Sequence, residues 1–83
     1  MNITDIRIKK IDDKNRLKAI AAITIDNCFV IHELRIIEGD SGLFIAMPSR
    51  KLPNGTFRDV AHPINSETRE QVEKLIIEAY NNL

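Results

Sequence analysis

The hydrophobic pattern of this chain changes its period once, at Pro63, and this change limits the folds that are open to it. Asn65 or Ser66 after that proline is a suitable helix N-cap, and Glu67 and Glu70 suit the positive end of a helix dipole. The pattern therefore predicts a C-terminal amphipathic helix over about residues 66–82. The apolar side chains that recur with helical spacing are Val72, Leu75, Ile76, Ala79, Tyr80 and Leu83.

Before Pro63 the apolar residues follow the two-residue period of β-strands. A polar run at residues 12–15 and the pair Asp26-Asn27 separate the first three strands, and Pro53-Asn54-Gly55 suits a three-residue hairpin loop before the last strand. The five predicted strands are centred on Ile6 and Ile8, and on residues 17–25, 29–37, 43–47 and 57–61.

These elements predict one α+β domain over residues 1–83, with strands over about residues 2–62. The expected architecture is a mostly antiparallel five-stranded sheet with the C-terminal helix packed on one face. In the second strand Leu17, Ala19, Ala21, Ile23 and Ile25 share a face; in the third, Phe29, Ile31 and Ile37 alternate with Val30, Leu34 and Ile36.

The second and third strands are therefore expected to be apolar on both faces. One helix can cover only one face of a sheet, so another copy of the chain is the expected cover for the remaining apolar surface. This interpretation predicts a two-fold homodimer. Tight packing of the alanine-rich second strand inside a single core is the alternative.

Charge is balanced over the whole chain but segregated along it. The 12 basic and 12 acidic residues give a net charge of zero, so no overall field draws the chain to nucleic acid or to a membrane. Residues 1–25 and 41–64 carry a positive excess, and residues 26–40 and 65–83 carry a negative one. An electrostatic function would therefore come from a local cluster.

Cysteine usage and hydropathy indicate a reducing compartment. Cys28 is the single cysteine and cannot form an intramolecular disulfide, and no hydrophobic stretch is long enough for a signal peptide or a membrane span. We therefore expect a cytoplasmic protein without a membrane partner.

The strongest candidate site is the predicted hairpin after the fourth strand. Arg50, Lys51 and Arg58 gather around its turn, and the first acid beyond them is Asp59. Clustered guanidinium and ammonium groups on a rigid turn suit a polyanion such as nucleic acid. A solvated hairpin without a ligand is the alternative.

Arg69 is a second candidate, near the buried side of the predicted helix N-terminus. It could add to an anion site together with the free N–H groups of that helix end and the hairpin. Pairing of Arg69 with Glu73, or with Asp59, is the alternative, and the sequence leaves both open.

Catalytic and metal-binding sites have little support. Asp59 and His62 could form an acid–base pair, but no nucleophile or oxyanion turn accompanies them. Cys28 and His32 would be roughly 13 Å apart on a strand, too far for one metal ion. No Gly-rich phosphate loop is present. We therefore expect no enzyme, no metal, no cofactor and no small-molecule substrate.

Over essentially its whole length the chain resembles the SpoVG family, which is named for a bacterial septation and sporulation protein. The stretches that carry the likeness are ITDIRI, AIAAITID, FVIHELRII, GLFIAMPSRK, FRDVAHPIN and SETRE. The resemblance implies a small cytoplasmic dimer with a β-sheet and a C-terminal helix. It also implies a regulator of gene expression that binds DNA, and in some members RNA, rather than an enzyme.

The family's basic pattern carries over to four positions of this chain. Its pair after Met-Pro-Ser falls on Arg50 and Lys51, its Phe-Arg-Asp arginine on Arg58, and its helix-opening arginine on Arg69. These positions are the expected nucleic-acid-binding residues; Cys28 departs from the family pattern. A non-enzymatic adaptor that binds proteins in septation or sporulation is the alternative function.

Overall fold

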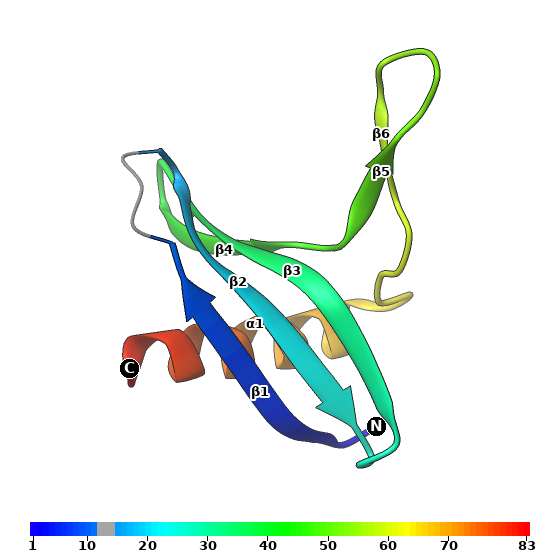
Figure 1. The fold of residues 1–83 in the computed structure, drawn as a ribbon. Coiled ribbons are helices and arrows are strands. Elements are labelled where there is room, and N and C mark those ends of the chain that lie inside the picture. Colours follow the sequence, from blue (N-terminus) through cyan, green and yellow to red (C-terminus); the bar gives the residue numbers. More distant parts are fainter. Residues whose placement is uncertain (12–14) are drawn as a thin grey trace.

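The computed structural model describes residues 1–11 and 15–83, so residues 12–14 of the predicted polar turn lie outside the described part. The described chain has an α+β fold in which a helix lies across one face of a sheet and a separate hairpin projects away from both (Figure 1). Its elements are β1 (Ile3–Lys10), β2 (Leu17–Ile25), β3 (Phe29–Gly39), β4 (Gly42–Ala46), β5 (Ser49–Lys51), β6 (Phe57–Asp59) and α1 (Ser66–Asn81).

The main sheet has four strands in the order β1-β2-β3-β4, and every neighbouring pair is antiparallel. The predicted fifth strand exists as β6, but it pairs with β5 in a second, two-stranded sheet, so the prediction of one five-stranded sheet is wrong. Pro48 supplies the physical reason, because it lacks the N–H group that would continue the ladder of β4. Its carbonyl oxygen instead accepts from the N–H of Val60 at 2.8 Å, which closes the base of the hairpin.

The core lies between the helix and the inner face of the sheet. Bulges in β1, β2 and β3 determine which side chains reach this face. The buried core residues, each at most 6% exposed, are Ala19, Ala21, Ile23, Leu34, Ile36, Ile45, Met47, Val72 and Ile76.

The bulge in β3 overturns the predicted alternation of that strand. Ala21 pairs with Leu34, whereas Ile23 pairs with Ile31, so β3 contains one extra residue between these pairs. Glu33 lies at this point with φ of 64°, in the left-handed region. Ile31 therefore packs on the same core as Leu34, and the prediction that placed it on the opposite face is wrong.

A second bulge, at Lys18, removes Leu17 from the inner face. Leu17 pairs with Ile37, but Ala19 pairs with Ile36, and both Ala19 and Ile36 are fully buried. The predicted shared face of Leu17 and Ala19 is therefore wrong, because an extra residue in a strand shifts the side-chain alternation.

The C-terminal helix confirms the change of period at Pro63. Its N-cap is Asn65, whose side-chain oxygen accepts from the N–H of Thr68 at 2.8 Å. The helix ends at Asn81, so Leu83 lies beyond it and is 64% exposed, against the prediction that it belongs to the apolar stripe. Of the predicted stripe, Val72 and Ile76 lie in the core and Tyr80 packs against it, and Ile77 packs there as well. In the part of the chain that the structure describes, no helix has both the length and the apolar character needed to cross a membrane.

Candidate nucleic-acid interface

The β5–β6 hairpin carries three of the four predicted site residues on a projecting two-stranded ribbon. Its tip confirms the predicted loop: Gly55 has φ of 88°, and its N–H donates to the Leu52 carbonyl oxygen at 2.9 Å. The two strands contact chiefly each other, so the ribbon stands clear of the sheet and the helix (Figure 1). Local hydrogen bonds therefore define its shape.

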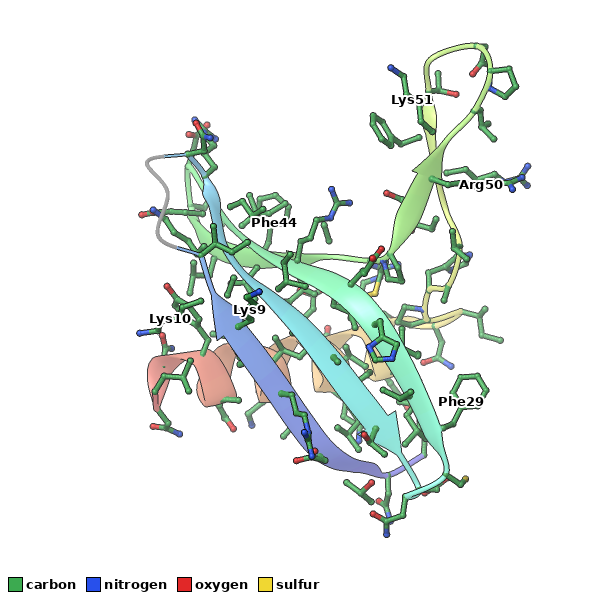
Figure 2. All side chains as sticks on the ribbon, viewed as in Figure 1. Lys9, Lys10, Phe29, Phe44, Arg50 and Lys51 are labelled. Carbon is green, nitrogen blue, oxygen red and sulfur yellow. The ribbon has the colours of Figure 1, made fainter. Side chains whose placement is uncertain are left out.

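Strand register places the two arginines of the ribbon together and separates them from the lysine. Arg50 lies directly opposite Arg58, and Lys51 lies opposite Phe57. Directly opposite residues share a face, and consecutive residues on a strand point to opposite faces. Figure 2 shows the side chains of Arg50 and Lys51 leaving the ribbon on opposite sides. We call the side of Arg50 and Arg58 the arginine face.

The arginine face is exposed and has no neutralising carboxylate. Among residues 1–11 and 15–83 the ion pairs are Arg7–Asp5, Arg16–Asp40 and Lys18–Glu38, and none involves the hairpin. Asp59 pairs across the ribbon with Ser49, so its side chain belongs to the opposite face from Arg58. Like charges directly opposite each other destabilise a strand pair, and an anionic partner would remove that repulsion.

Arg35 anchors the base of the hairpin, and sequence reasoning did not identify it. It lies on β3, and its guanidinium group donates to the Ser49 hydroxyl at 3.1 Å and to the Met47 carbonyl oxygen at 3.5 Å. The charged contact ties Met47, just after β4, and Ser49, the first residue of β5, to β3. Its signal in the sequence is a single basic residue inside the apolar run Leu34 to Ile37.

Arg69 belongs to the first turn of the helix and not to the ribbon. Its side chain is partly buried, and it forms no ion pair with Glu73 or Asp59 within the described residues. The alternative in which Arg69 is neutralised by one of these acids is therefore wrong. Its place in an anion site shared with the hairpin stays a prediction.

The geometry around His62 does not assemble an acid–base pair with Asp59. His62 Nδ1 lies 2.9 Å from the Pro63 carbonyl oxygen, so this nitrogen carries the donor proton. Across the described ranges no hydrogen bond joins the imidazole to Asp59, and no group of three His, Cys, Asp or Glu side chains is arranged to hold a metal ion.

The outer face of the main sheet, turned away from the helix, carries apolar side chains around Arg35, which lies on β3 between Ile20 and Ala46. Ile20 pairs with Arg35, Arg35 with Ala46, and Ile37 with Phe44, which places these residues on one surface. Phe44 is 46% exposed and stands on this side of β4 (Figure 2). None of the described elements packs over this surface, which agrees with the prediction that the helix covers only one face. We call the patch formed by Ile20, Ala22, Ile37, Phe44 and Ala46 the outer patch.

Comparison with known proteins gives matches along the whole chain. The SpoVG family model matches residues 1–82. A relative from Caldicellulosiruptor bescii, named septation protein SpoVG, is 61% identical over 80 residues, which cover 96% of this chain and 91% of the relative. Relatives of the same name from Clostridium perfringens and an Exiguobacterium species are each 57% identical over all 83 residues and are themselves covered to 92% and 84%.

Proposed function

This chain belongs to the SpoVG family, and from that premise and the free arginine face we propose that it is a nucleic-acid-binding regulator of gene expression. It acts in the cytoplasm as a homodimer, without catalysis, and binds DNA through Arg50, Lys51, Arg58 and Arg69. RNA is a second ligand of the same basic groups. The septation named in its relatives, together with sporulation and cell division, is the process that this regulation serves.

The single observation that carries the proposal is the pairing of Arg50 with Arg58 on a projecting ribbon without a carboxylate on that face. Guanidinium groups bind phosphate oxygens through paired hydrogen bonds and keep their charge at any physiological pH. Because the whole chain is neutral, this local cluster would supply the attraction to a polyanion. Such contacts give affinity and register, and base contacts give sequence choice.

The outer patch supports the homodimer. Its side chains extend across β2, β3 and β4 and have no cover from the described elements of one chain. The patch surrounds Arg35, whose guanidinium group donates to Ser49 and Met47, and exposed apolar surface is typical of protein interfaces. A two-fold pair that buries the patch presents two arginine faces, which would double the number of phosphate contacts on one duplex.

The test is a gel shift of the purified protein with mixed-sequence DNA and RNA at several salt concentrations. Three to four phosphate contacts per protomer predict that log K falls with log salt at a slope of roughly −3 per protomer, because each contact contributes about 0.9 on duplex DNA. The triple variant Arg50→Ala, Lys51→Ala and Arg58→Ala should reduce this slope to about −1, because only the contact of Arg69 remains. Lys74→Ala is the matched control, because Lys74 is an exposed cation on the helix.

The adaptor function gives the opposite result. It uses the outer patch and the acidic stretch of residues 26–40 to bind proteins, and it predicts no shift with DNA or RNA at any salt concentration. A salt-independent shift, or one that the triple variant leaves unchanged, also contradicts the phosphate-contact mechanism. Size measurement of the wild type and of Phe44→Ala tests the dimer separately, since Phe44 lies in the outer patch.

A further inference from the structure

Building on the proposed function, we propose that the β5–β6 hairpin enters the major groove of B-form DNA with its arginine face against the base edges. Arg50 and Arg58 then contact base edges in place of phosphates, so the salt slope per protomer becomes about −2, from Lys51 and Arg69. Lys51, on the opposite side of the ribbon, contacts no base. The ligand assigned to the hairpin is thus a B-form duplex and not single-stranded RNA.

The shape of the ribbon suits this groove. Two paired strands lie about 4.8 Å apart, and the major groove of B-form DNA, about 12 Å wide and 8.5 Å deep, admits a two-stranded ribbon. The paired part of the ribbon is three residues long in each strand, about 7 Å between the first and last Cα at roughly 3.3 Å per residue, and Arg50 and Arg58 form its middle pair. Laid along the groove with its arginine face inward, the ribbon presents this pair to the base edges, and its projection from the sheet and the helix keeps both outside the groove (Figure 1).

The hydrogen-bond donors of the arginine face match the acceptors on base edges. Arg50 and Arg58 lie opposite each other, so their Cβ atoms are about 5 Å apart and both guanidinium groups reach the same part of the groove. Each group offers five N–H donors, and the groove floor presents base nitrogen and oxygen acceptors. Asp59 is on the other face, which keeps its carboxylate away from those acceptors.

The opposite face of the ribbon carries the competing possibility. Phe57 is 68% exposed and lies opposite Lys51. An exposed ring beside a cation can stack on an unpaired base. Phe57 is a single aromatic side chain and could stack on only one base. The two arginines lie on one face and could both donate to the nitrogen and oxygen acceptors of neighbouring base edges. We therefore favour the duplex as the ligand.

Groove access can be tested with a blocked duplex. The probe is a mixed-sequence DNA duplex in which every cytosine is replaced by glucosylated 5-hydroxymethylcytosine, because the sugar fills the major groove and leaves the phosphates and the minor groove unchanged. Binding to the unmodified duplex should be about ten-fold or more tighter than to the blocked one, as the loss of arginine–base contacts requires. A duplex RNA of the same sequence should also bind weakly, because its major groove is deep and narrow.

Variants assign the effect to one face of the ribbon. Arg50→Ala with Arg58→Ala should weaken binding to the unmodified duplex by about ten-fold per arginine and leave binding to the blocked duplex nearly unchanged. The matched control Lys51→Ala should lower both affinities by the same factor. Thermal unfolding of each variant shows whether the body of the protein is intact, since the substituted side chains are exposed.

The outcomes separate this inference from the function on which it rests. Equal affinity for blocked and unmodified DNA overturns the major-groove assignment and leaves nucleic-acid binding in place. Tighter binding to single-stranded RNA that is lost in Phe57→Ala also overturns it and transfers the site to the other face. Failure to bind any of the probes overturns the proposed function itself.

Discussion

Two consecutive isoleucines on β3 allow the two faces of the sheet to be tested with the same substitution. Ile36 is fully buried against the helix, and Ile37 belongs to the outer patch. Replacement of Ile36 by alanine removes three carbons, worth about 2.4 kcal/mol at roughly 0.8 kcal/mol each, and leaves a cavity that adds to the loss. We expect Ile36→Ala to lower the free energy of unfolding by about 3 kcal/mol.

This loss is large for a domain of 83 residues, whose total stability is about 4–12 kcal/mol. The melting temperature of Ile36→Ala should fall by roughly 12–24 °C, since a small domain loses about 4–8 °C per kcal/mol. Ile37→Ala should cost less than about 1 kcal/mol in the isolated chain, because its side chain is already partly exposed. The lower strand propensity of alanine affects both variants and cancels in the comparison.

The assay is urea unfolding followed by circular dichroism at two protein concentrations about a hundredfold apart. If a second copy covers the outer patch, the effect of Ile37→Ala should grow with concentration while that of Ile36→Ala stays constant. An equal loss from both substitutions in dilute protein would refute the assignment of the two faces. A concentration-independent effect of Ile37→Ala would refute the dimer through this patch.

Substitutions at three further positions test local features of the fold. Arg35→Ala should raise the rate of amide hydrogen exchange in β5 and β6 by about ten-fold or more, because the contacts with Ser49 and the Met47 carbonyl are lost. The rate is measured by mass spectrometry. An unchanged exchange rate would refute the anchoring role of Arg35. Asn65→Ala should cost about 1 kcal/mol in urea unfolding, whereas Asn65→Asp should keep the cap. Glu33→Gly should gain about 0.5–1 kcal/mol by relieving the left-handed backbone, and Glu33→Ala, which keeps a Cβ atom, should gain nothing.

The elements that the sequence predicts well are those with a local cause. The helix follows from the spacing of Val72 and Ile76 and from the cap at Asn65, and the hairpin tip follows from the glycine at residue 55. Each of these elements depends on residues that are close together in the sequence. Such features can be recognised without knowledge of the rest of the fold.

The elements that the sequence predicts poorly depend on register. Strict alternation assigns Ile31 and Leu17 to the wrong faces, because it assumes strands without bulges. The bulge positions are occupied by Glu33 and Lys18, whereas glycine or asparagine is the residue that often indicates a bulge. Two adjacent polar residues inside an apolar strand, His32 and Glu33, are the signal that could have indicated the break.

In the candidate site, too, the features with a local cause are predicted and those that depend on strand pairing are missed. Arg50 and Arg58 are predicted together because a tight turn brings neighbouring segments close, and the structure places them opposite each other. Lys51 is placed on the other face by the pairing of β5 with β6, which follows the end of the β4 ladder at Pro48. Arg35 is missed because its contacts with Ser49 and Met47 join residues more than ten positions away along the chain.

The self-contained hairpin has a consequence for how this protein can change over evolution. Residues 49–59 add little to the packing between sheet and helix, so substitutions there spend almost none of the stability reserve of so small a domain. Under the proposed function, ligand preference and foldability are encoded in different parts of the chain. A lineage could redirect this protein to new targets by altering one short loop, without first acquiring compensating changes elsewhere.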